Sequence, residues 1–240
     1  MARRPARSPA RSGSASNGDT PPQELSERGR IIHAFMALLA EHAFEDISLA
    51  NIAAGAGLTL AQLRGEFGSK FAVLAAHIKD VDRLVLARGD AEMAEESARE
   101  RLFDVLMRRL EILVPHKDAI ESLLRSARRD PALAFALNGL AVRSQQWMLA
   151  AADIDGNGPP GVLRAQGLAL LFARVLQTFV RDEDEGLART MARLDRELGR
   201  GQRWLDMLDG LCRLSPTRCS RRRSRRHRDA DRGDEEPVAA

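Results

Sequence analysis

Tyrosine is absent from this 240-residue sequence, and aromatic residues make up only 4% of it. Strand-rich folds depend on aromatic and β-branched side chains. The scarcity of aromatic residues, together with 44% hydrophobic residues, therefore predicts an all-α fold with a core of Leu, Ala, Val and Ile. No apolar run approaches the roughly 18–20 residues of a membrane span, and no hydrophobic segment follows the N-terminus as in a signal peptide. We expect no stable membrane insertion.

Cysteine is nearly absent as well. Cys212 and Cys219 are the two in the chain, and both fall near its C-terminal end, where a disulfide would have no core to join. This pattern indicates reduced thiols and a cytoplasmic protein. The five histidines are scattered, no Cys or acid completes a metal set, and no glycine-rich phosphate loop follows a strand. The sequence predicts no metal site, no cofactor and no enzymatic activity.

Positive charge is concentrated at the two ends. Residues 1–23 carry four Arg against one acid, and residues 215–240 carry eight Arg against five acids, a balance of +3 in each. Because the whole chain has a net charge of +3, the remaining residues 24–214 hold −3. Both ends are rich in Arg and Ser without apolar periodicity, so we predict a disordered basic arm and a disordered Arg-rich tail. The tail is compatible with nucleic-acid or anionic-lipid contact, and equally with an incidental end.

Between these ends, apolar side chains recur at helical spacing. In residues 24–88, Ser48, Thr59 and Ser69 are each placed to cap a helix, and Gln62 follows Thr59 at capping-box spacing. The small residues of "GAG" (55–57) predict a tight turn with at least one unusual backbone conformation.

Further helices are expected in residues 89–214. We predict a short helix over 116–125, a helix begun by Asp130 and Pro131, a loop at "DGNGPPG" (155–161), and long helices over about 162–181 and 185–211.

Two short helices joined by a tight glycine-bearing turn are typical of a helix-turn-helix. With its flanks, "ISLANIAAGAGLTLAQLRGEFGSKFAVL" resembles the N-terminal domain of TetR-family transcriptional repressors over roughly residues 26–86. The matching features are Ile52-Ala53, Ala56-Gly57-Leu58, Thr59, Leu63, Phe67 and Gly68-Ser69-Lys70. The resemblance implies a three-helix DNA-binding domain at 24–88, a helical ligand-binding and dimerisation domain at 89–214, a homodimer, and a double-stranded DNA operator as partner.

The same resemblance implies which residues meet DNA. Thr59 and Lys70 are expected to contact phosphate, and Gln62 a base edge. An aromatic usually follows the inward Leu in that family, and here Arg64 stands there and can replace its phosphate contact. Ser48 and Leu60 complete the expected set.

The predicted DNA-binding domain is poor in positive charge. Residues 24–88 carry seven basic and eight acidic side chains, although phosphate attraction supplies most nonspecific affinity. We expect the arm to compensate through its four arginines, Arg3, Arg4, Arg7 and Arg11. The alternative is a helical scaffold that no longer reads DNA.

A second resemblance covers residues 99–205, which are similar to the lipid-binding accessory proteins of ubiquinone biosynthesis. It implies a TetR-like fold whose partners are a lipid and an enzyme, with no operator. Under either reading we expect a pocket for a small apolar ligand or lipid beside Leu106, Leu110, Trp147 and Phe172. Ordinary core packing or a dimer interface would use the same residues. Clustering of Glu45, Asp46 and Glu66 on the DNA-facing surface would favour the lipid-binding alternative. Without such a cluster, we favour a repressor that its ligand releases from DNA.

Overall fold

The computed structural model describes residues 26–88 and 95–213, with side chains as far as residue 201. The expected arm (1–23) and tail (215–240) lie outside the described residues. Within them every regular element is helical, as the composition predicted: α1 (Glu27–Glu41), η1 (Phe44–Asp46), α2 (Leu49–Gly55), α3 (Leu60–Glu66), α4 (Lys70–Ala87), α5 (Ala98–Leu113), η3 (Val114–His116), α6 (Lys117–Arg129), α7 (Pro131–Ala151), α8 (Gly158–Phe179) and α9 (Ala188–Arg213).

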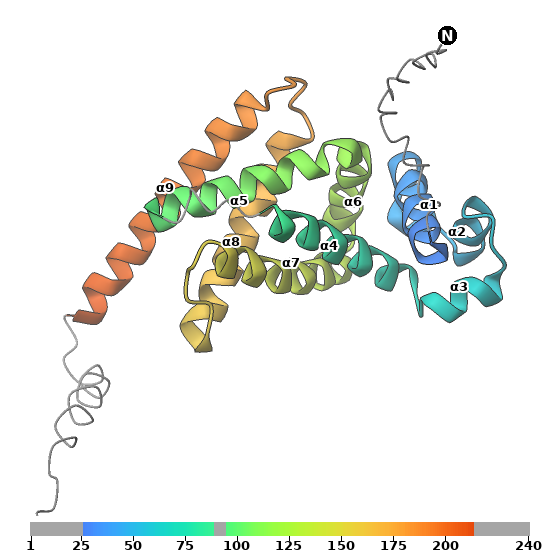
Figure 1. The fold of residues 1–240 in the computed structure, drawn as a ribbon, viewed down its shortest axis with the longest axis horizontal. Helices are drawn as coiled ribbons and strands as arrows, with labels where there is room; N and C mark the ends of the chain where they lie inside the picture. The colour runs from blue at the N-terminus through green and yellow to red at the C-terminus, as the bar shows by residue number, and fades with distance from the viewer. Residues whose placement is uncertain (1–25, 89–94, 214–240) are drawn as a thin grey trace, which may run out of the picture.

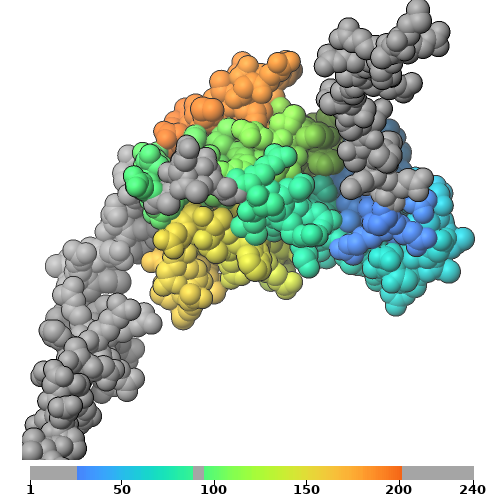
Figure 2. All heavy atoms as spheres, in the orientation of Figure 1, coloured from blue at the N-terminus to red at the C-terminus, as the bar shows by residue number. Residues whose placement is uncertain are grey.

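The chain forms a head, α1 to α3, and a body, α5 to α9, joined by α4. Figure 1 shows the head at one end of the molecule and α4 running from it into the body, between α5 and α7. The space-filling view in Figure 2 shows the same head projecting from the larger body. Helix α4 belongs to both parts, because Val73 and Leu74 are buried in the head core whereas Val81 and Val85 are buried in the body core.

Local hydrogen bonds start the helices of the head where the sequence predicted. The side chains of Ser26, Ser48, Thr59 and Ser69 accept hydrogen bonds from backbone N–H groups in the first turns of α1 to α4. The turn between α2 and α3 contains Gly57 at φ +66°, a conformation that L side chains rarely adopt. These bonds satisfy N–H groups that have no partner inside a helix.

The head also packs against the body through α1, which lies along α6. Ala119 of α6 and Leu133 of α7 are buried in the head core. The Ser122 hydroxyl donates to the His42 carbonyl at 2.7 Å, and the Phe44 N–H donates to the Ser126 hydroxyl at 3.1 Å. Two buried serines one turn apart on α6 therefore hold the loop that follows α1.

Two predicted boundaries in the body were wrong. Helix α6 continues to Arg129 instead of ending at Arg125, and α8 begins at Gly158, inside the segment expected to be a loop. Proline is tolerated in the first turn because its missing N–H would have had no helical partner. A Cβ at Gly161 would lie 1.9 Å from the Gly156 carbonyl oxygen, so this glycine lets the helix start close against the preceding chain.

The predicted start of α7 is confirmed: the Asp130 carboxylate accepts from the N–H groups of Ala132 and Leu133, with Pro131 in the first turn. Across the described ranges, 26–88 and 95–213, no helix combines the length and apolarity needed to span a membrane.

Candidate functional site

Helix α3 presents a short outward face that is set by its cap. The Thr59 hydroxyl accepts from the Gln62 N–H at 3.2 Å, and the Gln62 side-chain oxygen accepts from the Thr59 N–H at 3.0 Å. One of the two N–H groups of the Gln62 side-chain amide donates to Glu27 of α1 at 2.9 Å. The capping box is thus confirmed, and a bidentate base contact by Gln62 requires that its side-chain oxygen leave Thr59.

Leu63 and Arg64 occupy opposite sides of α3. Leu63 is 1% exposed and anchors the helix in the head core, as its predicted inward position requires. Arg64 is exposed and, among the described residues, has no ion-pair partner, and Leu60 is 55% exposed on the same short helix. The outward face therefore offers one unpaired guanidinium and one apolar side chain.

Ser48 begins α2 in the same way. Its hydroxyl accepts from the Asn51 N–H at 3.1 Å, while the Asn51 side-chain oxygen accepts from the Ser48 N–H at 3.2 Å. Both residues are exposed. The N-terminus of α2 is therefore a second accessible helix start beside α3.

The structure places Lys70 differently from the expected phosphate contact. Its ammonium donates to three backbone carbonyl oxygens, of Phe44 at 2.6 Å, Ile47 at 3.0 Å and Glu45 at 3.2 Å, and lies 4.6 Å from the centre of the Phe44 ring. An ammonium has three N–H donors, so none remains for phosphate. A cation in the first turn of a helix is disfavoured by the helix dipole. The position of Lys70 at the start of α4 was therefore the sequence signal that its ammonium group is stabilised by acceptors outside that helix.

Glu45 does not lie with Glu66 on the surface of α3. The carboxylate of Glu45 faces α6: its own backbone N–H, then the Ser126 hydroxyl, lower its pKa, with Arg129 contributing. Glu66 lies at the far end of α3. The acidic cluster that would have favoured the lipid-binding alternative is therefore incomplete, since Glu45 is directed toward the body.

A buried polar cluster joins three helices in the body. The Arg109 guanidinium of α5 donates to the Asp82 carboxylate of α4 and to the Ser144 hydroxyl of α7, both at 2.6 Å, and Ser144 donates to Asp82 at 2.7 Å. All three residues are buried. Burial lowers the pKa of Arg109, and Asp82 opposes this shift. Sequence periodicity places Asp82 on the apolar stripe of α4, which was the available signal.

Three of the four expected pocket residues lie beside this cluster. Leu106 and Leu110 are fully buried, Phe172 is 5% exposed, and the Arg109 guanidinium lies 5.3 Å from the centre of the Phe172 ring. Trp147 does not join them, because it is 59% exposed. Helix α7 turns Ser144, Gln145 and Met148 inward, and Trp147 projects from the opposite side of the same turn.

Three buried atoms in this region have no hydrogen-bond partner among the described residues. They are Nε of Arg109, the side-chain oxygen of Gln145 and Nε2 of His77, in residues that are 6%, 1% and 8% exposed. Unsatisfied buried polar atoms are costly.

His77 makes the stability of this region dependent on pH. Burial, followed by His116 and Arg109, lowers its pKa from 6.5 to about 4, and its ring lies edge-on to that of His116 at 4.7 Å. A lowered pKa means that the unfolded chain binds the proton more readily. The stabilising contribution is therefore complete above pH 6.5 and is lost as the pH falls toward 4.

We expect the wild-type protein to lose about 2 kcal/mol of its free energy of unfolding through His77 between pH 7.5 and pH 5. His77→Phe should lack this component, because it removes the titrating group and keeps a ring. Urea denaturation at the two pH values measures the difference. His42→Ala removes an exposed histidine and should retain the wild-type dependence. Equal pH dependence in wild type and His77→Phe would contradict the prediction.

No protein-family model and no curated protein matches the chain. Solved structures do. A TetR transcriptional regulator from Nitrosomonas europaea is 22% identical with a TM-score of 0.58, over 73% of this chain and 97% of that one. Another, from Rhodococcus sp. RHA1, is 20% identical with a TM-score of 0.52, over 72% of this chain and 94% of that one. The fold is that of the TetR regulators.

The similarity covers nearly the whole of the two solved TetR structures and more than two thirds of this chain, so it includes the body as well as the head. It confirms the TetR-like all-α fold that residues 26–86 predicted. At these identities it establishes the fold alone. Neither structure is of an accessory protein of ubiquinone biosynthesis, and the second resemblance receives no support from them.

Proposed function

We propose that this protein is a homodimeric transcriptional repressor that binds a double-stranded DNA operator through α2 and α3. The single observation that carries the proposal is the accessible, capped α3, whose outward face holds Arg64 free of any ion pair in the described part of the chain. A helix-turn-helix needs such a face to reach base edges. A TetR fold without a reading function would not require it.

The exposed residues at the start of α2 and on α3 have the following roles in this proposal. Arg64 and the Thr59 hydroxyl contact phosphate, which positions the head without selecting a sequence. Gln62 reads a base edge, and Leu60 is suited to a thymine methyl group. Ser48 contacts the backbone from the start of α2. Lys70 is excluded from the DNA contacts because three carbonyl groups already occupy its N–H donors.

Apolar side chains that the single chain leaves exposed support the proposed dimer. Leu163 and Leu170 are 61% and 51% exposed on one face of α8, with Gly167 between them. Phe135 and Trp147 are 81% and 59% exposed on α7, which packs against α8. Exposed large apolar groups on adjacent helices are typical of a subunit interface. A second copy of the chain would bury them.

The ligand of the proposed repressor binds in the body and releases the operator. Leu106, Leu110 and Phe172 supply the apolar lining for a small apolar molecule or lipid. The Asp82–Arg109 pair connects this region to α4, whose first half is buried in the head core. A ligand that binds the two arrangements of α4 with different affinities would shift the head, whereas equal affinity would shift nothing.

We expect Arg64→Ala and Gln62→Ala to impair DNA binding in different ways. Arg64→Ala should weaken binding to all sequences alike and reduce the salt slope by about 0.9, the value for one phosphate contact. Gln62→Ala should reduce the discrimination against the wrong base at one position of the operator by about 1–3 kcal/mol. Fluorescence anisotropy on DNA selected by the wild-type protein from a random pool, in a salt titration, measures both.

Arg83→Ala, which removes a 75% exposed arginine far along α4, is the matched control and should bind DNA like wild type. Equal loss of sequence preference in Arg64→Ala and Gln62→Ala would contradict the roles assigned to them. A full-length protein that binds no DNA at any salt concentration, yet is stabilised by a lipid, would overturn the repressor and leave the lipid-binding accessory function.

A further inference from the structure

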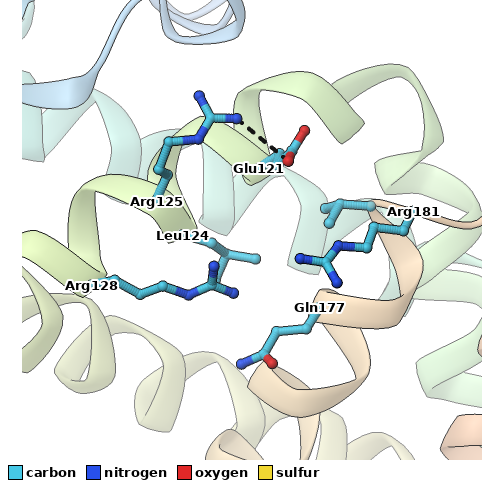
Figure 3. Close-up of a pocket in the computed structure, with 7 residues that line it drawn as sticks. Glu121, Leu124, Arg125, Arg128, Gln177 and Arg181 are labelled. Atoms are coloured by element: carbon cyan, nitrogen blue, oxygen red, sulfur yellow. Dashed lines mark ion pairs between the residues drawn. The ribbon is translucent and has the colours of Figure 1, made fainter.

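A hollow between α6 and α8 gathers three arginines. It is open to solvent, its empty space of about 260 Å³ includes part of that solvent, and it is lined by Glu121, Leu124, Arg125, Arg128, Gln177, Val180 and Arg181. Figure 3 shows the guanidinium groups of Arg128, from α6, and Arg181, from the turn that follows α8, pointing toward one another across it. The side-chain amide of Gln177 lies below them in that view.

The charge of the hollow is not balanced by the protein. Arg125 pairs with Glu121 at 3.4 Å, but both side chains are about half exposed, and such surface pairs are weak. Arg128 and Arg181 form no ion pair within the described ranges. Like charges that face each other repel, so the arrangement is relieved when an anion lies between them.

Arg128 lies on α6, and Arg181 lies two residues beyond the end of α8. Leu124 and Val180 are partly buried between α6 and α8 and form an apolar floor. Beyond Arg181, the buried Asp182 accepts from the Thr190 N–H at 2.8 Å and from its hydroxyl at 2.6 Å, which fixes the end of α8. The backbone that carries each arginine is therefore held by a packed helix or by the Asp182 hydrogen bonds, which favours preorganised binding.

We propose that this hollow is a binding site for a phosphoryl group, carried by a small ligand or present as free phosphate. A guanidinium offers a planar fork of N–H donors that matches phosphate oxygens in pairs. Two such forks, together with the Gln177 amide, suit a dianion, and the Leu124–Val180 floor accommodates an apolar portion next to it. The site is distinct from the buried ligand region and from α3, and does not depend on the proposed DNA binding (Figure 1).

Calorimetric titration of the full-length protein tests this site with three probes at constant ionic strength. The probes are inorganic phosphate, monomeric dihexanoyl phosphatidic acid, and dihexanoyl phosphatidylcholine, whose phosphate is diesterified and whose headgroup is neutral overall. We expect saturable binding of phosphatidic acid and no binding of phosphatidylcholine. Binding of inorganic phosphate as well would show that the site takes the free ion, and its absence would show that an attached apolar chain is needed.

The double variant Arg128→Gln/Arg181→Gln should bind the phosphoryl probe about tenfold more weakly or worse, since two charge-assisted contacts are lost. Arg143→Gln/Arg189→Gln removes the same charge from exposed arginines outside the hollow and should change affinity less than about twofold, because distant exposed charges are screened. Both variants alter surface residues, and thermal melting checks that they fold. Equal weakening in the two variants, or no saturable binding by wild type, would overturn the proposal. So would loss of DNA binding alone in Arg128→Gln/Arg181→Gln, which would assign the hollow to nucleic acid.

Discussion

Asp82→Ala is expected to lower the free energy of unfolding by about 3–5 kcal/mol, the cost of leaving one member of a buried ion pair without its partner. The Asp82 carboxylate accepts from Arg109 at 2.6 Å and from Ser144 at 2.7 Å. Without it, the guanidinium of Arg109 remains 6% exposed against Phe172 with no counter-charge. Because domains are stable by only about 5–15 kcal/mol, this single change removes a large share of the stability.

Urea denaturation measures the effect, and Asp80→Ala is its matched control. Asp80 lies on the same helix, but its side chain is 40% exposed and pairs with Arg83 at 3.7 Å on the surface, so its loss should cost less than about 1 kcal/mol. The double variant Asp82→Leu/Arg109→Met should recover most of the loss, because no charge is then buried. If Asp82→Ala is no less stable than Asp80→Ala, the cluster is not the anchor of α4 in the body.

Lys70→Met is expected to lower the free energy of unfolding by about 3–4 kcal/mol, since hydrogen bonds from a charged donor contribute about 1.5–3 kcal/mol each and water replaces only part of them. Three backbone carbonyl groups between Phe44 and Ile47 lose their donor, and the ring of Phe44 loses its cation. The loop that leads into α2 should then be the first part of the head to open. Hydrogen exchange at the N–H groups of residues 44–52, beside urea denaturation of the whole protein, measures this opening.

Lys79→Met, which removes an exposed lysine from the same helix, should leave both measurements unchanged. At a temperature where Lys70→Met is fully folded, its affinity for DNA should fall no further than that of Lys79→Met. The opposite pattern, with stability retained and DNA affinity lost, would restore Lys70 to the phosphate contacts that the sequence resemblance implied.

The sequence alone determined the helical class and the starts of most helices. Ser48, Thr59, Ser69 and Asp130 each cap a helix as predicted, because a cap is a hydrogen bond between groups two or three residues apart and depends little on the rest of the chain. The same holds for the positive φ of Gly57. Leu63 was also placed correctly, as the resemblance to the TetR N-terminal domain implied.

Boundaries in the body were less predictable from sequence. The prolines and glycines of residues 158–161 indicate a loop by composition, yet proline is equally compatible with the first turn of a helix. Only the close approach of Gly161 to the Gly156 carbonyl shows which alternative the chain adopts. For α6, no residue between Arg125 and the Asp130 cap is typical of a helix end, and the helix continues to Arg129.

The residues of the candidate sites show the same difference between local contacts, which the sequence predicts, and distant contacts, which it does not. Contacts that join distant segments were decided by the tertiary structure: Lys70 with the carbonyl groups after α1, Asp82 with Arg109 and Ser144, and Arg128 facing Arg181. Trp147 lies outside the core because α7 can turn only one side inward, and its neighbours Ser144 and Met148 occupy that side. Helical periodicity shows which residues share a face. Which helix that face contacts depends on how the helices pack, and the spacing of residues along the chain does not determine this packing.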